Sequence, residues 1–393
     1  MRKLFFLPVL ALMFACGGEG SEETAGDFNY ELSYDVDTVM VDAGDHFFFL
    51  NWGMGIADVS SDAKTLYNLN PNSLLLEIVD LDQMKLKTTV QLEREGPNGV
   101  GGGFIGRLQV LDNGNIKLFD FNAIFEVNQQ GELVDKFEYE KSEWTGYEIT
   151  EEEQFEYYGT FSPDGKLFFT KLSEQGFGEP AKGILKADME AKTLELLDAG
   201  DMFERLDKFS ITMRSGDGTM MMTTGESVHT DFVNGDFVIT NAAFNEALVW
   251  QSQSDSLSQK NFNSSLTSNE KTGDFPSEVD SQEALMEIMQ KKQELVEFEG
   301  MIYHPEENLI WRFAEDKDRM IADSVIKKQV VTLFDTDYNM VHEQKIEDYP
   351  NASMRFFKDG MLYTYVNIDD EMAFARIKPK GEEGSGGSLV RTD

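Results

Sequence analysis

The stretch Phe161-Ser-Pro-Asp-Gly-Lys-Leu-Phe-Phe169 contains the pattern that decides the fold. Its Pro-Asp-Gly segment is typical of a tight turn, because Asp and Gly tolerate the backbone angles that turns require. The Leu-Phe-Phe segment that follows consists of residues that favour β-strands. The stretch therefore predicts a turn that leads directly into a strand.

This pattern recurs along the chain. A turn of Gly, Asp or Asn precedes an aromatic or aliphatic run at residues 44–50, 112–119, 234–239, 307–313 and 358–365. A second pattern, in which a polar turn separates two apolar runs, usually follows, at residues 76–92, 124–139, 184–197 and 331–346. Each of these pairs predicts a β-hairpin. We therefore expect an all-β protein built from successive meanders.

The spacing of the repeated strands predicts a six-bladed β-propeller over residues 28–380. The anchors are Phe47, Ile116, Leu167, Phe237, Leu309 and Met361, and their spacings are 69, 51, 70, 72 and 52 residues. Propeller blades repeat about every 40 to 50 residues. The three longer spacings then need insertions of about 20 residues or a missed blade, and residues 65–69 are a candidate further strand. A pair of β-sandwiches is the alternative architecture, because it has the same strand content without requiring six similar units.

One segment departs from the β pattern. Residues 277–298 are rich in helix formers, and their apolar residues recur at helical spacing. Asp280 or Ser281 could cap the start of this helix. We expect a surface helix inside an insertion of the fourth unit.

The first sixteen residues predict a lipoprotein signal peptide. Arg2 and Lys3 precede an apolar run over residues 4–15, and a small residue stands before Cys16. The run is too short to span a bilayer, which takes about 20 apolar residues. Cleavage would leave Cys16, the only cysteine, to carry palmitate and other lipid, so that the protein is anchored to a membrane without crossing it.

The predicted cleavage site leaves a chain that divides into a tether, a folded body and a tail. Residues 16–27 form an acidic flexible tether, and residues 381–393 form a flexible tail. We expect the folded body to be held at the bacterial cell envelope, at the outer membrane, with the choice between its periplasmic and surface leaflets left open.

The net charge of −38 limits the classes of molecule that the protein can bind. Such a chain repels phosphate groups, which excludes nucleic acid. The charge favours solubility and a monomer, and its sharper interpretation is attraction of divalent cations or of a basic partner.

Four residues near predicted loops are candidates for ligand binding. Arg94 and Arg107 flank a glycine-rich loop at residues 96–103, which lacks the Gly-Lys-Ser/Thr ending of a phosphate-binding loop. We expect this loop at one end of the ring, where the two arginines could hold an anionic group. Trp52 and Trp144 lie in predicted loops and are candidates for a contact surface that stacks on sugars.

The remaining chemistry-bearing residues give no catalytic set. The four histidines form no local pair of metal-binding spacing, and no Gly-x-Ser-x-Gly turn is present. His229 is kept as a ligand-binding candidate. No catalytic residue is assigned, and whether a metal binds stays open.

The chain resembles six-bladed β-propeller-like lipoproteins of Bacteroidota, a family of unknown function. The residues that carry the resemblance are the segment before Cys16, the acidic tether, Phe161-Ser-Pro-Asp-Gly-Lys-Leu-Phe-Phe169 and Met301-Ile-Tyr-His-Pro-Glu-Glu-Asn-Leu-Ile-Trp-Arg-Phe313. The resemblance implies an envelope protein with Cys16 as its lipid site and a ligand- or protein-binding role. It supplies no catalytic residues.

Two functions follow from the sequence. The first is a lipid-anchored propeller without catalysis or cofactor that binds a ligand, a glycan or an envelope protein at one end of the ring. The alternative is a calcium-dependent propeller hydrolase acting on phosphate esters or lactones, with its ions in an acidic central channel.

Overall fold

The structure is a computed structural model that describes residues 32–138, 143–176, 179–215, 221–321, 324–347, 350 and 354–380. The predicted signal peptide at residues 1–15, the lipidation site Cys16, the tether at residues 16–27 and the tail at residues 381–393 lie outside the described residues. Neither helix within the described ranges is long and apolar enough to cross a membrane.

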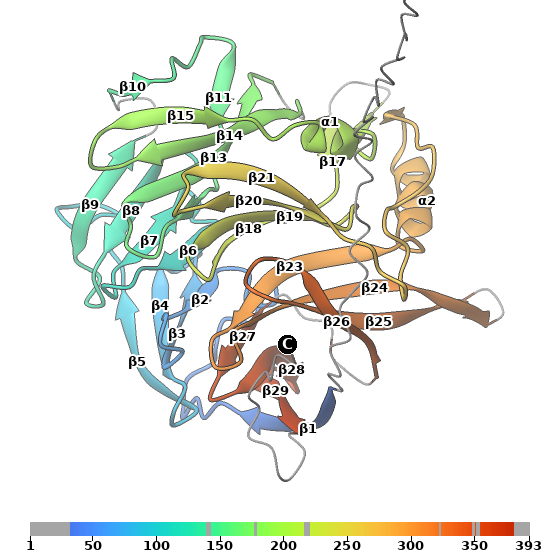
Figure 1. Cartoon of the computed structure of the whole chain (residues 1–393). Helices are drawn as coiled ribbons and strands as arrows, with labels where there is room; N and C mark the ends of the chain where they lie inside the picture. The colour runs from blue at the N-terminus through green and yellow to red at the C-terminus, as the bar shows by residue number, and fades with distance from the viewer. Residues whose placement is uncertain are drawn as a thin grey trace, which may run out of the picture.

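The described residues form seven β-sheets, six of which contain four strands or more (Figure 1). The first sheet contains β2 (Ala57–Val59), β3 (Thr65–Asn70), β4 (Leu75–Asp80) and β5 (Lys85–Gln91). The second contains β6 (Arg107–Val110), β7 (Ile116–Phe119), β8 (Ala123–Val127) and β9 (Leu133–Glu138). The third contains β10 (Thr145–Gly146), β11 (Glu153–Phe155), β12 (Thr160–Phe161), β13 (Leu167–Glu174), β14 (Ala181–Asp188) and β15 (Thr193–Leu197). The expected all-β body is therefore confirmed.

In the fourth and fifth sheets the strands lie side by side in the order in which they follow along the chain. The fourth contains β18 (Val228–Val233), β19 (Asp236–Asn241), β20 (Glu246–Gln251) and β21 (Ser256–Asn261). The fifth contains β23 (Glu297–His304), β24 (Leu309–Ile321), β25 (Ser324–Phe334) and β26 (Met340–Ile346). In both sheets each strand pairs antiparallel with the next strand in the chain.

The sixth sheet joins the two ends of the described body. It contains β27 (Arg355–Lys358), β28 (Met361–Ile368) and β29 (Glu371–Lys380), followed by β1 (Ser33–Met40). β1 pairs antiparallel with β29 along its whole length. The first and last described strands thus lie side by side, and each supplies hydrogen bonds that the other's edge would otherwise lack.

Helices appear beside a small seventh sheet of β16 (Ile211–Arg214), β17 (Met221–Thr224) and β22 (Glu278–Val279). Helix α2 (Gln282–Lys292) lies inside the range predicted to be helical, and its Leu285 and Ile288 pack in one cluster with residues of β16. Ser281 caps α2, because its hydroxyl accepts a hydrogen bond from the amide of Ala284. A short helix α1 (Met202–Asp207) was not predicted.

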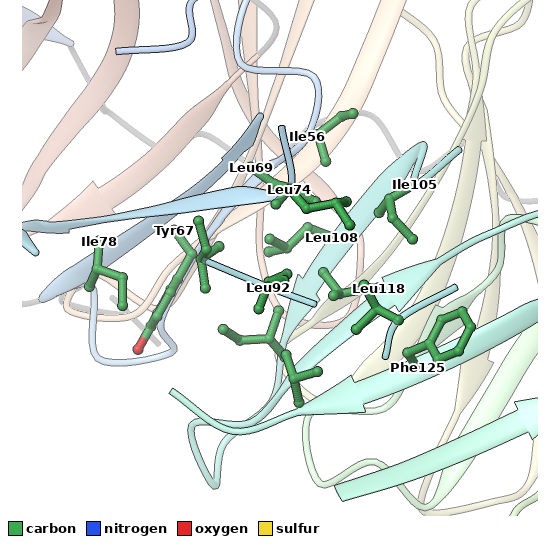
Figure 2. Close-up of a cluster of buried hydrophobic side chains, with 14 of the residues drawn as sticks. Ile56, Tyr67, Leu69, Leu74, Ile78, Leu92, Ile105, Leu108, Leu118 and Phe125 are labelled. Atoms are coloured by element: carbon green, nitrogen blue, oxygen red, sulfur yellow. The ribbon is translucent and has the colours of Figure 1, made fainter. Parts of the chain in front are cut away.

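Hydrophobic clusters connect each large sheet to the next. Figure 2 shows the cluster between the first and second sheets, which includes Tyr67, Ile78, Leu108 and Leu118. Corresponding clusters follow around the molecule, with members Phe119 and Phe168, Phe169 and Phe237, Val249 and Ile310, Trp311 and Phe357, and finally Leu66 and Tyr363. The last cluster joins the sixth sheet back to the first. Each fully buried side chain of this size contributes about 1.5–3 kcal/mol, so stability comes from packing between sheets.

The repeated turn-and-strand pattern coincides with the start of a strand in five of its six occurrences. β7, β13, β19, β24 and β28 begin where the pattern predicts a strand. Residues 44–50 do not form a strand, and the expected position is occupied by β3, which covers the candidate strand at residues 65–69. The backbone of residues 46–49 is instead tied to a buried carboxylate, as described below.

Candidate functional site

Six aromatic side chains from three sheets form one partly exposed surface, here called the aromatic surface. Its members are Phe49 and Trp52 before β2, Phe104 before β6, Phe121 between β7 and β8, and Tyr157 and Tyr158 before β12. The ring centroids of consecutive members lie 5.4–6.5 Å apart, in the order Phe49, Trp52, Phe104, Phe121 and the tyrosine pair. Trp52 is the most exposed of them, with 57% of its surface accessible. Contiguous exposed aromatic rings of this kind mark an interaction site.

A buried carboxylate holds one end of the aromatic surface in place. Glu77, on β4, is fully buried and accepts hydrogen bonds from the amide of Phe49 and the side chain of Asn68. His46 Nε2 lies 2.7 Å from the same carboxylate. Asn68 also donates to the carbonyl of Phe49. Because a buried charge must be paired, these bonds fix the loop backbone that carries Phe49 and Trp52.

Backbone strain coincides with the most exposed ring. Trp52 and Met54 adopt φ values of 64° and 66°, in the left-handed region. This conformation costs an L-residue roughly 1–2 kcal/mol. Strain of this kind persists where the surrounding structure imposes it, and it clusters at functional sites. The loop therefore holds an exposed tryptophan in a conformation that a glycine would adopt without cost.

Two glycines allow the centre of the aromatic surface to pack closely. A Cβ atom on Gly103 would lie 1.8 Å from Asp120 Oδ2, and one on Gly106 would lie 2.1 Å from the Tyr158 hydroxyl. Burial and the nearby Asp120 carboxylate raise the pKa of Tyr158, so its hydroxyl stays protonated and can donate. Glycine at these two positions thus permits the loop before β6 to approach Asp120 and Tyr158 closely.

The first strands of the large sheets carry charged residues that face a common centre. Arg107 of β6 donates to the carbonyl of Gly159 and the hydroxyl of Thr160. Asp58 of β2 accepts from the amide of Val110, at the interface between the first and second sheets. Burial, opposed in part by two backbone hydrogen bonds, raises the pKa of Asp58 to about 7.

Asp231 of β18 belongs to the same group of charges. It interacts electrostatically with both Asp58 and Arg107. Its pKa is raised, because the surrounding strands remove bulk solvent even though the carboxylate itself is exposed toward the centre. The centre of the molecule therefore places two carboxylates and one arginine within electrostatic reach.

Beside these charges lies a cavity of about 680 Å³, here called the central pocket. It is lined by residues of β18 and β23, with Glu315 of β24 and Arg355 of β27. Arg355 forms an ion pair with Glu299 and lies over the Phe313 ring, with its guanidinium carbon 4.8 Å from the ring centroid. A cavity of this size is in the range that small-molecule ligands occupy.

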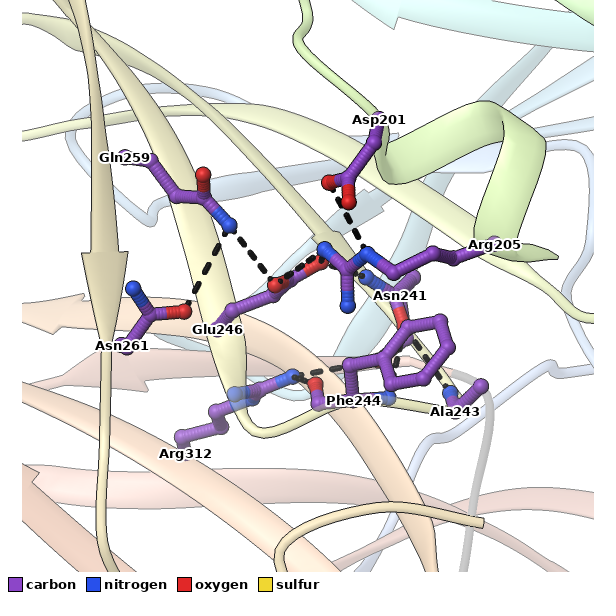
Figure 3. Close-up of polar contacts among 9 residues, drawn as sticks. All are labelled: Asp201, Arg205, Asn241, Ala243, Phe244, Glu246, Gln259, Asn261 and Arg312. Carbon is purple, nitrogen blue, oxygen red and sulfur yellow. Dashed lines mark hydrogen bonds and ion pairs between the residues drawn. The ribbon is translucent and has the colours of Figure 1, made fainter. Parts of the chain in front are cut away.

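A buried polar network links α1, the fourth sheet and the fifth sheet (Figure 3). Glu246 accepts two hydrogen bonds from Arg205 of α1 and others from Asn241 and Gln259. Arg312 of β24 is also buried, and it donates to backbone and side-chain oxygens of the fourth sheet. Because the hydrogen bonds of Arg312 cross between the fourth and fifth sheets, they fix two walls of the central pocket relative to each other.

No metal centre can be assigned within the described ranges. Among those residues, no group of three or more His, Cys, Asp or Glu side chains is arranged to hold an ion. The described part of the chain therefore assigns no residues to calcium, which takes six to eight oxygen ligands.

The five predicted ligand-binding residues lie in different places. Trp52 belongs to the aromatic surface, Arg107 lies at the centre, and His229 lines the central pocket. Arg94 is exposed and donates to the carbonyl of Asn72. Trp144 is half-buried against Phe137, with Lys192 over its ring, at the outer side of the third sheet.

Sequence reasoning missed most of the aromatic surface. Phe121 stands between Asp120 and Asn122 at a hairpin turn, and Tyr157-Tyr158 stands before Gly159. The signal that could have identified them is an aromatic residue at a turn position, where polar residues are usual. Nothing in the sequence predicted that these turns meet, because they belong to different sheets.

Comparison with known proteins gives a family and a fold. The DUF4221 family, a domain of unknown function, matches residues 29–345. A crystal structure of a DUF4221 family member from Bacteroides vulgatus ATCC 8482 is similar to this chain with a TM-score of 0.60 and 14% identity, covering 90% of this chain and 99% of that one. The resemblance to propeller-like proteins of unknown function is thereby confirmed.

Two other solved structures are similar to a lesser degree. The β-propeller domain of Swd1 from Myceliophteria thermophila has a TM-score of 0.37 and 7% identity, covering 88% of this chain and 100% of that one. Hydrazine synthase from Kuenenia stuttgartiensis has a TM-score of 0.40 and 12% identity, covering 80% and 74%. No match was found among curated proteins.

Proposed function

The chain belongs to the DUF4221 family, whose function is unknown, and from this premise we propose that it is a lipid-anchored protein of the cell envelope whose aromatic surface binds a glycan. The observation that carries the proposal is the row of contacting, partly exposed rings from three sheets, held by a buried carboxylate and by a strained loop. Such a surface is ordered before any ligand arrives, which lowers the entropic cost of binding.

We infer that the six large sheets are the blades of a six-bladed propeller. Each sheet shares a hydrophobic cluster with the next, and the sixth shares one with the first. Closing the ring in this way leaves no exposed sheet face between units. The aromatic surface then lies on loops at one end of the ring, where binding residues concentrate on rigid scaffolds.

A glycan is the favoured ligand because polar side chains lie beside the aromatic rings. A sugar has an apolar face of C–H groups, which the negative face of an aromatic ring attracts, and a rim of hydroxyl groups. Asn51 and Asn122 are exposed beside the rings, and the Asp120 carboxylate lies against the same loops. These groups would exchange hydrogen bonds with hydroxyls while the rings stack on the sugar faces.

The anchor is proposed on the sequence before Cys16. Cleavage at this cysteine and acylation would hold the body at the envelope. Mass spectrometry of the exported protein would then find acyl chains on an N-terminal Cys16, and an unmodified thiol there would refute the anchor.

The test of glycan binding uses the change of Trp52 to glycine. Glycine adopts a φ of 64° without strain, so we expect Trp52→Gly to leave the melting temperature within a few degrees. Loss of the most exposed ring should weaken binding of the sugar to which the wild-type protein binds by at least about tenfold. The measurement is calorimetric titration with cello-, chito-, manno- and galacto-oligosaccharides.

Two further variants serve as controls for this experiment. Trp52→Phe retains a ring and should retain most of the affinity. Met286→Ala removes an exposed apolar side chain on α2, which is not part of the aromatic surface. If no oligosaccharide binds wild type, or if Trp52→Gly binds as well as Met286→Ala does, the proposal is wrong. Recovery of a protein whose binding depends on Trp52 would replace the glycan with a protein partner.

A further inference from the structure

The central pocket is separate from the aromatic surface and offers mainly hydrogen-bond acceptors. Asp231, Glu297, Glu299 and Glu315 contribute carboxylates to its lining. Arg355 is the only Lys or Arg among the described lining residues, and its ion pair with Glu299 already uses its charge. The lining therefore sets four carboxylates against one guanidinium, and Arg107, outside the lining, lies within electrostatic reach of Asp231.

Two of these carboxylates are placed directly opposite each other. Glu297 of β23 and Glu315 of β24 are cross-strand partners in the ladder. Like charges in this relation are destabilising. Lys327 lies 3.3 Å from the Glu315 carboxylate and partly offsets the repulsion, whereas Glu297 is exposed and has no such neighbour among the described residues. The pair persists at a cost that a bound cation would remove.

His229 adds a neutral acceptor to the same wall. Burial and the positive charge of Arg312 lower the pKa of His229 to about 4, although a hydrogen bond to the backbone of Phe298 opposes the shift. The imidazole is therefore neutral near pH 7. A neutral imidazole has one donor and one acceptor nitrogen, and the bond to Phe298 occupies the donor. The other nitrogen is then available to accept.

We propose that the central pocket binds an organic cation, a primary amine or guanidinium compound, with Asp231 and Glu297 as its charge partners. A cation of this class brings several N–H donors to the acceptors of the wall. The cavity volume of about 680 Å³ suits a small organic molecule. The described lining residues do not form the compact set of oxygen ligands that a metal ion requires. This site does not depend on glycan binding at the aromatic surface.

The experiment is calorimetric titration of the protein with cadaverine, spermidine and agmatine at low ionic strength. The diol 1,5-pentanediol serves as the uncharged analogue of cadaverine. We expect at least one cation to bind and the diol not to bind. Asp231→Asn and Glu297→Gln should each weaken cation binding by about tenfold, because each removes a charge-assisted hydrogen bond.

Matched controls remove equal charge elsewhere. Asp207→Asn on α1 and Glu283→Gln on α2 change exposed carboxylates and should leave the affinity within about twofold. Equal weakening by the control and pocket variants would reveal attraction to the overall negative charge and overturn the proposal. Equal binding of the diol, or binding of calcium alone with no binding of any of the three amines, would also overturn it. Glu297 is exposed, so its variant keeps the test valid if Asp231→Asn does not fold.

Discussion

Replacing Arg312 with alanine is expected to lower the free energy of unfolding by about 3–5 kcal/mol. Arg312 is only 2% exposed. It donates to the carbonyls of Asn241 and Phe244 (Figure 3). It also donates to the carbonyl of Glu299 and to the side-chain oxygen of Asn245. Alanine would leave these buried acceptors without a donor and would open a cavity.

Two opposing effects decide the size of this loss. Burial lowers the pKa of Arg312 to about 9, so the guanidinium is still charged at pH 7 and its desolvation already reduces stability. Removing the guanidinium also removes the free-energy cost of its desolvation. The unsatisfied acceptor oxygens and the cavity cost more than this, because breaking a buried network costs more than forming it gains. The net effect is therefore a loss.

Urea denaturation of Arg312→Ala and of Arg319→Ala measures this difference. Arg319 lies on the same strand, is exposed, and forms an ion pair with the adjacent Asp318, so its removal should cost less than about 1 kcal/mol. A loss for Arg312→Ala no larger than that for Arg319→Ala would show that the fourth and fifth sheets do not depend on this network.

Replacing Asp58 with asparagine is expected to stabilise the protein in a pH-dependent way. In the folded protein the pKa of Asp58 is raised to about 7, against about 3.9 in an unfolded chain. The unfolded chain therefore releases its proton near pH 4, while the folded protein holds it until near pH 7. Stability contributed by this group is present at low pH and is lost as pH rises through that window.

Asparagine does not titrate, so the gain from Asp58→Asn should be small at pH 4 and about 4 kcal/mol at pH 8. The denaturation midpoints of wild type and Asp58→Asn at several pH values measure this gain in stability. Asp45→Asn changes an exposed carboxylate before the first sheet and should give a difference that stays nearly constant over this range. A constant difference for Asp58→Asn as well would mean that the carboxylate is not desolvated.

The repeated strands could be predicted because their information is local. A turn residue followed by aromatic and β-branched residues specifies a hairpin wherever it occurs, as β13 and β28 illustrate. Residues 44–50 show the same local pattern and form no strand. There the backbone amide of Phe49 bonds to Glu77, a residue of β4 that the pattern could not reveal as its partner.

The candidate sites could be predicted only in part, because they are assembled from separate sheets. Trp52 was identified from its place in a loop, but its neighbour Phe104 comes from a different sheet. In the same way His229 shares the central pocket with Arg355 of β27. Distances between sheets depend on how the sheets pack against one another, which no local pattern encodes.

The most direct test of the account is hydrogen–deuterium exchange with and without the oligosaccharide that wild type binds. We predict that the sugar protects three loop regions together, around residues 49–52, 104–106 and 156–159, because the aromatic surface joins them into one site. Protection confined to a single sheet, or protection elsewhere with these loops unchanged, would contradict it.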